Sequence, residues 1–184
     1  MYELYILGEL MDRPLHGYLL HTILNRVVGP LRKISWGVLY PLIHGLEEEN
    51  LIEEVQGVAD TDGRGRKKKT YQITKQGKER FYRLMEEPIE YKTDYELHFY
   101  IKMANLDHVD EDVKLVIYHQ YRDYLRYIGR HIEELRNDVV VEKNIPPSEL
   151  PHILSVFEHR SIHNELSENW IQKKIEELKE KRLK

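Results

Sequence analysis

The sequence predicts a mainly α-helical fold with one short β-hairpin, arranged as a small domain followed by a helical extension. Apolar residues recur every three or four positions over most of the 184 residues, which is the spacing of amphipathic helices. The pattern changes at 51–58 and 71–73, where short apolar or alternating runs flank the turn residues Asp62, Gly63 and Gly65. A chain of this length can hold one small domain and additional helices.

Proline and glycine mark the ends of the first two helices. The first is expected over residues 2–12, because Pro14 disfavours helix in the residue before it. The second begins after Gly17 and ends near Gly29-Pro30. Their apolar stripes are Leu4, Ile6, Leu7, Leu10 and Met11 in the first helix, and Tyr18, Leu19, Ile23, Leu24 and Val27 in the second.

Ser35 is suited to cap a third helix, which closes in the polar residues 47–50. Its buried stripe is expected to be Leu39, Leu42, Ile43 and Leu46. Pro41 inside this helix removes one backbone hydrogen bond and crowds the carbonyl of Gly37. A slight bend of the helix and simple tolerance of proline near a helix start are both compatible with the sequence.

The hairpin leads into a fourth helix. Thr74 is a good N-cap for a helix that starts at Lys75, carries Phe81, Leu84 and Met85, and is interrupted at Glu87-Pro88. The order of three helices, a strand, a turn, a strand and a helix is that of a winged helix-turn-helix. We therefore expect residues 1–87 to form a winged helix-turn-helix DNA-binding domain.

Residues 88–184 are expected to be a helical domain. A short helix carries Leu97, Ile101 and Ala104, and two long amphipathic helices meet at the breaker Pro146-Pro147. The stripes of the long helices are Val113, Ile117, Tyr121, Leu125, Ile128, Ile132 and Leu135 in one, and Ile153, Val156, Phe157, Leu166, Trp170, Ile175 and Leu178 in the other, which runs from about 148 to 182. Two such helices do not close a core alone, so an antiparallel or coiled-coil arrangement within a homodimer is expected.

Composition narrows the function classes. The chain has no cysteine, which excludes disulfides and Cys-ligated metals and fits the cytoplasm, and no apolar run long enough to span a bilayer or act as an export signal. Neither a Gly-rich phosphate loop nor a nucleophile elbow is present, so we expect no enzyme, no catalytic residue and no cofactor. His159 and His163 are spaced i, i+4 with His152 on nearly the same side, but metal sensing, an effector pocket and ordinary packing stay open, and no metal is assigned.

Positive charge is concentrated in the first part of the chain. The net charge is −4, yet residues 1–85 carry 13 Lys/Arg against 11 Asp/Glu, and the remainder carries 15 against 21. Five cations stand within six residues at the tip of the hairpin, where they could be a solvated loop or could contact DNA phosphates. They are Arg64, Arg66, Lys67, Lys68 and Lys69.

Several short motifs resemble those of the PadR family of bacterial transcriptional regulators. They are Pro14-Leu15-His16-Gly17-Tyr18, Ser35-x-Gly37-x-Leu39-Tyr40-Pro41, Leu46-Glu47-Glu48-x-x-Leu51-Ile52, Gly63-Arg64-x-Arg66-Lys67 and Tyr71-x-Ile73-Thr74-x-x-Gly77. The total length resembles the larger subgroup of the family. Lys68-Lys69 look like an insertion in the wing, and Trp36 and Val38 replace smaller or more polar residues common in that helix. The resemblance implies a repressor whose winged helix binds promoter DNA, whose C-terminal helices dimerise, and which a small molecule or cellular signal releases.

The third helix is expected to enter the major groove of duplex DNA by its N-terminal turns. Ser35 and nearby backbone N–H groups can bind a phosphate, and the Tyr40 hydroxyl can reach the backbone or a base edge. The full set of expected DNA contacts is Arg32, Lys33, Ser35, Tyr40, Arg64, Arg66, Lys67, Lys68 and Lys69, on a palindromic operator.

Two further interpretations accompany this one. A small apolar or aromatic effector is expected near Tyr18, Phe157, His159 and Trp170, although the same residues would also suit a dimer core. The alternative function is a helical protein-interaction module whose basic wing binds an acidic partner. The 13 tyrosines could stack on single-stranded bases, but such rings are more often core or dimer-face residues.

Overall fold

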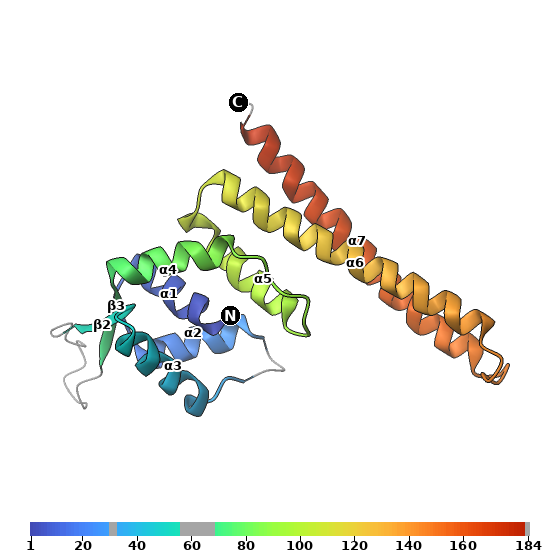
Figure 1. The fold of residues 1–184 in the computed structure, drawn as a ribbon, viewed down its shortest axis with the longest axis horizontal. Helices are drawn as coiled ribbons and strands as arrows, with labels where there is room; N and C mark the ends of the chain where they lie inside the picture. Colours follow the sequence, from blue (N-terminus) through green and yellow to red (C-terminus); the bar gives the residue numbers. More distant parts are fainter. Residues whose placement is uncertain (30–32, 56–68, 183–184) are drawn as a thin grey trace. The chain divides into compact units, whose positions relative to one another are not determined.

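We describe a computed structural model of the chain, covering residues 1–29, 33–55 and 69–182. It contains two compact units, Met1–Val113 and Lys114–Lys184. Figure 1 shows the elements in sequence colours. In chain order they are α1 (Tyr2–Asp12), β1 (Leu15–His16), α2 (Gly17–Val27), α3 (Trp36–Glu48), β2 (Ile52–Val55), β3 (Thr70–Ile73), α4 (Lys75–Glu86), α5 (Tyr95–Ala104), the 3-10 turn η1 (Leu106–His108), α6 (Glu111–Val141) and α7 (Leu150–Arg182). The fold class predicted from the sequence, a winged helix-turn-helix followed by antiparallel helices, is confirmed.

Helix α1 forms the centre of the first unit. Leu4, Ile6 and Leu7 are fully buried, because the helix lies against α2, α3, α4 and α5 rather than on the surface. The Tyr5 hydroxyl donates a hydrogen bond of 3.1 Å to the carbonyl oxygen of Leu20, which joins α1 to α2 and satisfies a buried polar group. The burial of nearly the whole first helix gives the other helices of this unit a common apolar surface.

The sheet has three antiparallel strands in the order β1-β3-β2, so the prediction of a two-stranded hairpin was incomplete. Ile52 pairs with Ile73 and Val55 with Thr70 between β2 and β3, and Leu15 pairs with Tyr71 between β1 and β3. Strand β1 consists of two residues, which is too short for alternation to be visible in the sequence. The predicted strand 51–58 is described only as far as Val55.

The ends of α3 and α4 are fixed by local hydrogen bonds. Asn50 has a positive φ of 56°, its N–H bonds to the Glu47 carbonyl, and the Leu51 N–H bonds to the Leu46 carbonyl. These bonds form a Schellman motif, in which Leu46 and Leu51 are both buried. Thr74 caps α4 as predicted, because its hydroxyl accepts a 3.0 Å bond from the Gly77 N–H. Both motifs hold the strands at a defined position relative to α3.

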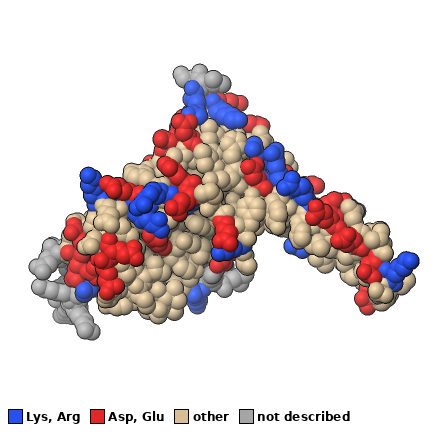
Figure 2. Space-filling view, viewed as in Figure 1, with Lys and Arg blue, Asp and Glu red and all other residues tan. Residues whose placement is uncertain are grey.

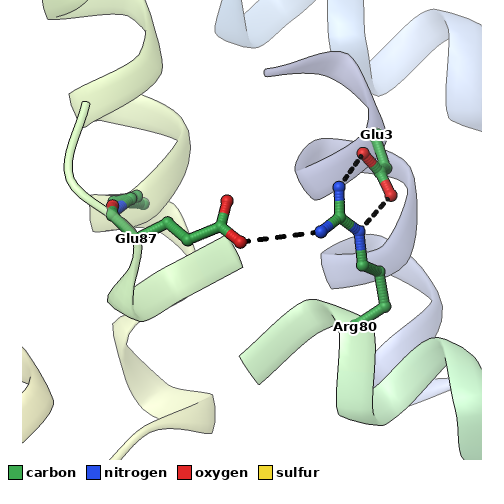
Figure 3. A network of polar contacts seen from close by, with 4 residues as sticks. Glu3, Arg80 and Glu87 are labelled. Atoms are coloured by element: carbon green, nitrogen blue, oxygen red, sulfur yellow. Dashed lines mark hydrogen bonds and ion pairs between the residues drawn. The ribbon is translucent and has the colours of Figure 1, made fainter. Parts of the chain in front are cut away.

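A polar bridge joins α1 to α4 on the surface of the first unit (Figure 3). The guanidinium of Arg80 binds both carboxylate oxygens of Glu3, with Nε–Oε1 at 2.8 Å and Nη2–Oε2 at 3.1 Å. Its third nitrogen lies 3.6 Å from Glu87 Oε1. The bidentate geometry is the one in which Arg–carboxylate pairs contribute most.

The second unit is built from α6 and α7, which lie side by side (Figure 1). The buried residues are Ile117, Tyr121, Leu125 and Ile132 on α6, and Phe157, Asn164, Ile171 and Ile175 on α7. A Cβ atom added at Gly129 of α6 would lie 2.9 Å from Asn164 Nδ2 of α7, so a glycine permits close approach of the helices there. Part of the stripe predicted for α7 is exposed instead: Val156, Leu166 and Trp170 are 56%, 63% and 39% accessible.

The unit boundary at 113/114 and the predicted domain boundary at 87/88 divide the chain by different criteria. The first follows backbone compactness and places α5 with the winged helix. The second marks the end of the DNA-binding part and stays a prediction. Within the described ranges, no helix is both long enough and apolar enough to cross a membrane.

Candidate nucleic-acid interface

Helix α3 has one buried and one exposed side. Leu39, Ile43 and Leu46 are 0%, 2% and 4% accessible and attach the helix to the core. Trp36, Val38 and Tyr40 are large, yet 41%, 45% and 56% accessible. A group of exposed aromatic and apolar side chains near the start of one helix is a candidate binding surface. Leu42, predicted to be buried, is only half-buried.

The start of α3 is tied to α2 by two side chains. The Ile34 N–H donates to Asn25 Oδ1 at 2.8 Å, and the Ile34 carbonyl accepts from Asn25 Nδ2 at 3.2 Å. His21 Nε2 lies 2.7 Å from the same carbonyl. These contacts satisfy the backbone of a buried residue directly before the helix and fix the angle between α2 and α3.

The indole of Trp36 is held by rings from α2. It stacks on His21 with ring centroids 4.3 Å apart and planes 13° apart, and on Tyr18 at 6.4 Å and 24°. His21 is held in turn by its hydrogen bond to the Ile34 carbonyl. The indole is therefore positioned before any partner binds, while a large part of it still faces solvent.

Ser35 occupies the N-cap position with an extended backbone, as predicted, but no capping hydrogen bond from its side chain is found among the described residues. Its carbonyl accepts the N–H groups of Val38 and Leu39, both at 3.1 Å. The expectation that the hydroxyl caps the helix was wrong. The hydroxyl can instead serve an external acceptor or donor, such as a phosphate at the helix start.

The α3 helix continues through Pro41 to Glu48, so the proline does not end it. Tyr40 and Pro41 are both exposed, and an added Cβ at Gly37 would meet only Ser35 Oγ, at 3.6 Å, within 4 Å. The glycine leaves open space beside the exposed side of the helix. A flat partner can therefore approach the backbone closely at this position.

Cations flank α3 but do not lie on it. Lys33 is exposed directly before the helix. Lys69, directly before β3, forms an ion pair with Glu54 of β2, with Nζ 2.7 Å from Oε2. The hydrogen bond to Glu54 raises the pKa of Lys69 above its usual value, so the ammonium stays charged at neutral pH. The other predicted cations, Arg32, Arg64, Arg66, Lys67 and Lys68, lie outside the described residues.

Acidic and basic side chains alternate on the face shown in Figure 2. That face has no extended surface of one sign among the described residues. Because the net charge of the chain is −4, electrostatic attraction to DNA requires a local group of cations.

The four predicted effector residues have different surroundings. Tyr18 is 61% accessible in the first unit and contacts Trp36, whereas the other three belong to α7. Phe157 is buried, Trp170 is partly exposed, and His159 Nε2 lies 3.1 Å from His163 Nε2. A groove of about 620 Å³ in the second unit is lined by other residues: Glu133, Arg136, Pro151, Leu154, Ser155, Glu158, Ser161, Ile162 and Glu165. The effector site stays a prediction.

The described ranges contain no group of three or more His, Asp or Glu side chains placed to hold a metal ion. The His159–His163 pair supplies two nitrogens, one fewer than the three protein ligands usual even in open catalytic zinc sites. Within those ranges, the described chemistry around α3 is that of a binding surface of aromatic, apolar and hydroxyl groups with cations at its border.

Comparison with protein families identifies residues 6–83 as a match to the model of the transcriptional regulator PadR-like family. The matched segment contains α2, α3 and the described strands. No curated protein matches the sequence. The matched family is one of transcriptional regulators rather than enzymes, and the resemblance expected from the sequence motifs is confirmed over these residues.

Similar solved structures include PadR of Bacillus subtilis in complex with operator DNA, at 17% identity and a TM-score of 0.43, covering 96% of this chain and 98% of that one. The PadR-like regulator BC1756 of Bacillus cereus is 24% identical with a TM-score of 0.40, covering 98% and 99%. The virulence activator AphA of Vibrio cholerae is 16% identical with a TM-score of 0.41, covering 97% and 98%. All three TM-scores are below 0.5, so the resemblance to the family rests on the match of residues 6–83.

Sequence reasoning did not find His21, Asn25 or Glu54 as parts of this surface. Asn25 and His21 are spaced i, i+4 on a helix that is otherwise apolar on one side, which is a weak signal for contact with a turn. Glu54 lies two residues after the buried Ile52, on the same face of the strand, so strand alternation did not predict its exposure, and its partner Lys69 depends on the strand register.

Proposed function

We propose that the protein is a cytoplasmic repressor that binds a palindromic operator in duplex DNA, since residues 6–83 match the model of the PadR-like family of transcriptional regulators. The observation that carries the proposal is the exposed side of α3, which presents Trp36, Val38 and Tyr40 beside the Ser35 hydroxyl, which caps no backbone N–H among the described residues. The second helix of a helix-turn-helix enters the major groove by its N-terminal residues.

The predicted DNA contacts fall into those made by α3 and those made by the cations around it. The Ser35 hydroxyl and the first backbone N–H groups of α3 bind a phosphate, and Tyr40 contacts the backbone or a base edge. Lys33 and Lys69 neutralise phosphates beside the helix, together with Arg32, Arg64, Arg66, Lys67 and Lys68. Phosphate contacts fix the register and supply affinity, while groups on α3 supply specificity.

The operator is bound by a homodimer formed through α7. Val156, Leu166 and Trp170 are exposed on one side of this helix, whereas its buried residues Phe157, Ile171 and Ile175 lie on the other. An apolar stripe of this kind is typical of a helix that packs against a second copy. Half-sites are then expected about one helical turn, ~34 Å, apart or at a multiple of it.

Release from DNA follows binding of a small apolar or aromatic effector, or another cellular signal. A ligand regulates only if its affinity differs between the DNA-binding and the released conformation. Replacing Trp170 by Leu should abolish ligand-dependent release without changing DNA affinity, if Trp170 contacts the effector. Dissociation of the dimer in Trp170→Leu would instead identify Trp170 as a packing residue.

The test is binding of the full chain to duplex and single-stranded DNA over a range of salt concentrations. We expect duplexes selected from a random library to bind more tightly than their separated strands, with log affinity falling linearly with log salt. Preference for single strands, or affinity that does not depend on salt, would contradict the proposal. Absence of DNA binding would favour the alternative, a module that binds an acidic protein through its wing.

A further inference from the structure

The residues of α3 restrict how this helix can read a base sequence, given the proposed function. From Ser35 to Leu46 the sequence is Ser-Trp-Gly-Val-Leu-Tyr-Pro-Leu-Ile-His-Gly-Leu. It contains no Arg or Lys, the usual partners of guanine, no Asn or Gln, the usual partners of adenine, and no Asp or Glu, which accept from cytosine. The bidentate side-chain contacts that usually define a base pair are therefore not available from residues 35–46, the part of the helix that leads into the groove.

Apolar contact is the main readout that this helix can provide. In the major groove, the C5-methyl group of thymine is the apolar feature that distinguishes one base pair from another. Trp36 and Val38 offer apolar surface at the helix start, with 41% and 45% of their areas accessible. Both lie within the first turn of α3, the part of a reading helix that comes closest to the bases.

The structure also prepares this surface for close contact. Trp36 is stacked on His21 at 4.3 Å, so its ring loses little freedom on binding. Gly37 lies between the two apolar residues, and a Cβ there would find only Ser35 Oγ within 4 Å. The helix backbone can consequently approach the floor of the groove without a side chain in between.

Tyr40 follows Trp36 by one helical turn on the same side, and it is 56% accessible. Its hydroxyl is a single donor and acceptor, so it can contact a phosphate or one base atom but cannot form a bidentate pair. It adds a polar contact without changing the apolar nature of the first turn.

We propose that α3 recognises its half-site through contact of Trp36 and Val38 with thymine methyl groups in the major groove. The sequence read by this helix is then defined by the positions of thymines rather than by guanines. The inference rests on the proposed function, since it assigns the chemistry by which the same surface selects its operator.

The test uses a duplex selected from a random library and the same duplex with deoxyuridine in place of every thymidine in the half-sites. Deoxyuridine keeps the base pairing and removes only the methyl group. For the wild-type protein we expect affinity to fall roughly fourfold for each contacted methyl group, the effect of exposing about one buried CH₂ or CH₃. Deoxyuridine placed only in the flanks is the DNA control and should have no effect.

Trp36→Ala and Val38→Ala identify the residues responsible. Each should weaken binding to the thymidine duplex and reduce the difference between thymidine and deoxyuridine duplexes. Val140→Ala, the same change as Val38→Ala at an exposed valine of α6, should leave that difference unaltered. Circular dichroism checks that each variant is folded, and Val38→Ala provides the test if Trp36→Ala is not.

The outcomes separate the inference from the proposed function. If no duplex binds, the function itself fails. If duplex binds and deoxyuridine has no effect in the wild type, the function stands and methyl recognition is wrong. If deoxyuridine weakens binding equally in the wild type and in both alanine variants, the methyl groups are read by other residues, and the assignment to Trp36 and Val38 is overturned.

Discussion

The ion pair between Lys69 and Glu54 should limit the DNA affinity of the free protein. Glu54 holds the Lys69 ammonium at 2.7 Å, and both side chains are partly exposed. In Glu54→Gln the ammonium loses its carboxylate partner and can bind a DNA phosphate instead. One added phosphate contact should steepen the slope of log affinity against log salt by about 0.9 per bound protomer. Lowering salt fourfold, for example from 0.2 to 0.05 M, should then strengthen binding by roughly a further three- to fourfold.

The matched control is Glu53→Gln, the neighbouring residue on the same strand. It removes the same charge, but Glu53 accepts a 2.6 Å hydrogen bond from Gln72 on β3, whereas the described ion pair of Lys69 is with Glu54. Fluorescence anisotropy of a labelled duplex at four or more salt concentrations gives the slope for each variant. Equal slopes for Glu54→Gln and Glu53→Gln would show that only total charge matters, and would refute a specific phosphate contact by Lys69.

Three further predictions concern the scaffold. Gly77→Ala should destabilise the protein by at least about 2 kcal/mol in thermal or urea unfolding, because the new Cβ would lie 2.0 Å from the Leu51 carbonyl oxygen. Gly45→Ala, where nothing lies within 4 Å, should instead stabilise it by roughly 0.5–1 kcal/mol, and similar losses in both would contradict the packing described here. Burial lowers the pKa of the Lys102 ammonium from 10.5 to about 8. Between pH 8 and pH 10.5 the unfolded chain therefore keeps this proton, whereas the folded chain has lost it. The free energy of unfolding should therefore rise by about 3 kcal/mol from pH 8 to pH 10.5, and this group should not affect it below pH 8. A Lys102→Met variant that shows the same rise would exclude Lys102 as its source. Leu166→Glu, on the exposed stripe of α7, should shift the protein toward monomer in analytical ultracentrifugation, whereas Gln172→Glu, also exposed, should not; an unchanged dimer in Leu166→Glu would place the interface elsewhere.

Most elements were predictable because their signals are local. Proline at position 14, the Thr74 N-cap and the helical stripe of residues 2–12 depend only on neighbours in the chain, and the structure has α1 and the start of α4 at the predicted positions. The same holds for the polar end of α3, where Asn50 adopts the left-handed conformation that ends the helix.

What the sequence did not predict depends on contacts between distant residues. Strand β1 exists because Leu15 pairs with Tyr71, 56 positions later, and two residues have no periodicity of their own. The buried side of α7 carries Phe157, Asn164, Ile171 and Ile175, whereas Leu166 and Trp170, although apolar, are exposed. The spacing of apolar residues alone could not distinguish the side of α7 that packs against α6 from the apolar side that is exposed.

The candidate site likewise has features that local sequence signals predict and features that depend on contacts between distant residues. The position of α3 and its exposed Tyr40 followed from the stripe Leu39, Ile43 and Leu46. The stacking of Trp36 on His21 and the pairing of Lys69 with Glu54 require the α2–α3 angle and the strand register. In the sequence, Trp36 and Val38 were notable only as departures from a family pattern. The structure shows that both side chains are exposed at the start of α3.

The chain has two tryptophans, Trp36 at the start of α3 and Trp170 on α7, and their fluorescence tests the central claim most directly. In Trp170→Phe, the emission comes from Trp36, and in Trp36→Phe it comes from Trp170. If α3 is the surface that contacts DNA, saturating duplex should change the intensity or wavelength of Trp36 emission and leave Trp170 emission nearly constant. A change confined to Trp170, with Trp36 unaffected by duplex that is shown to be bound, would contradict the account.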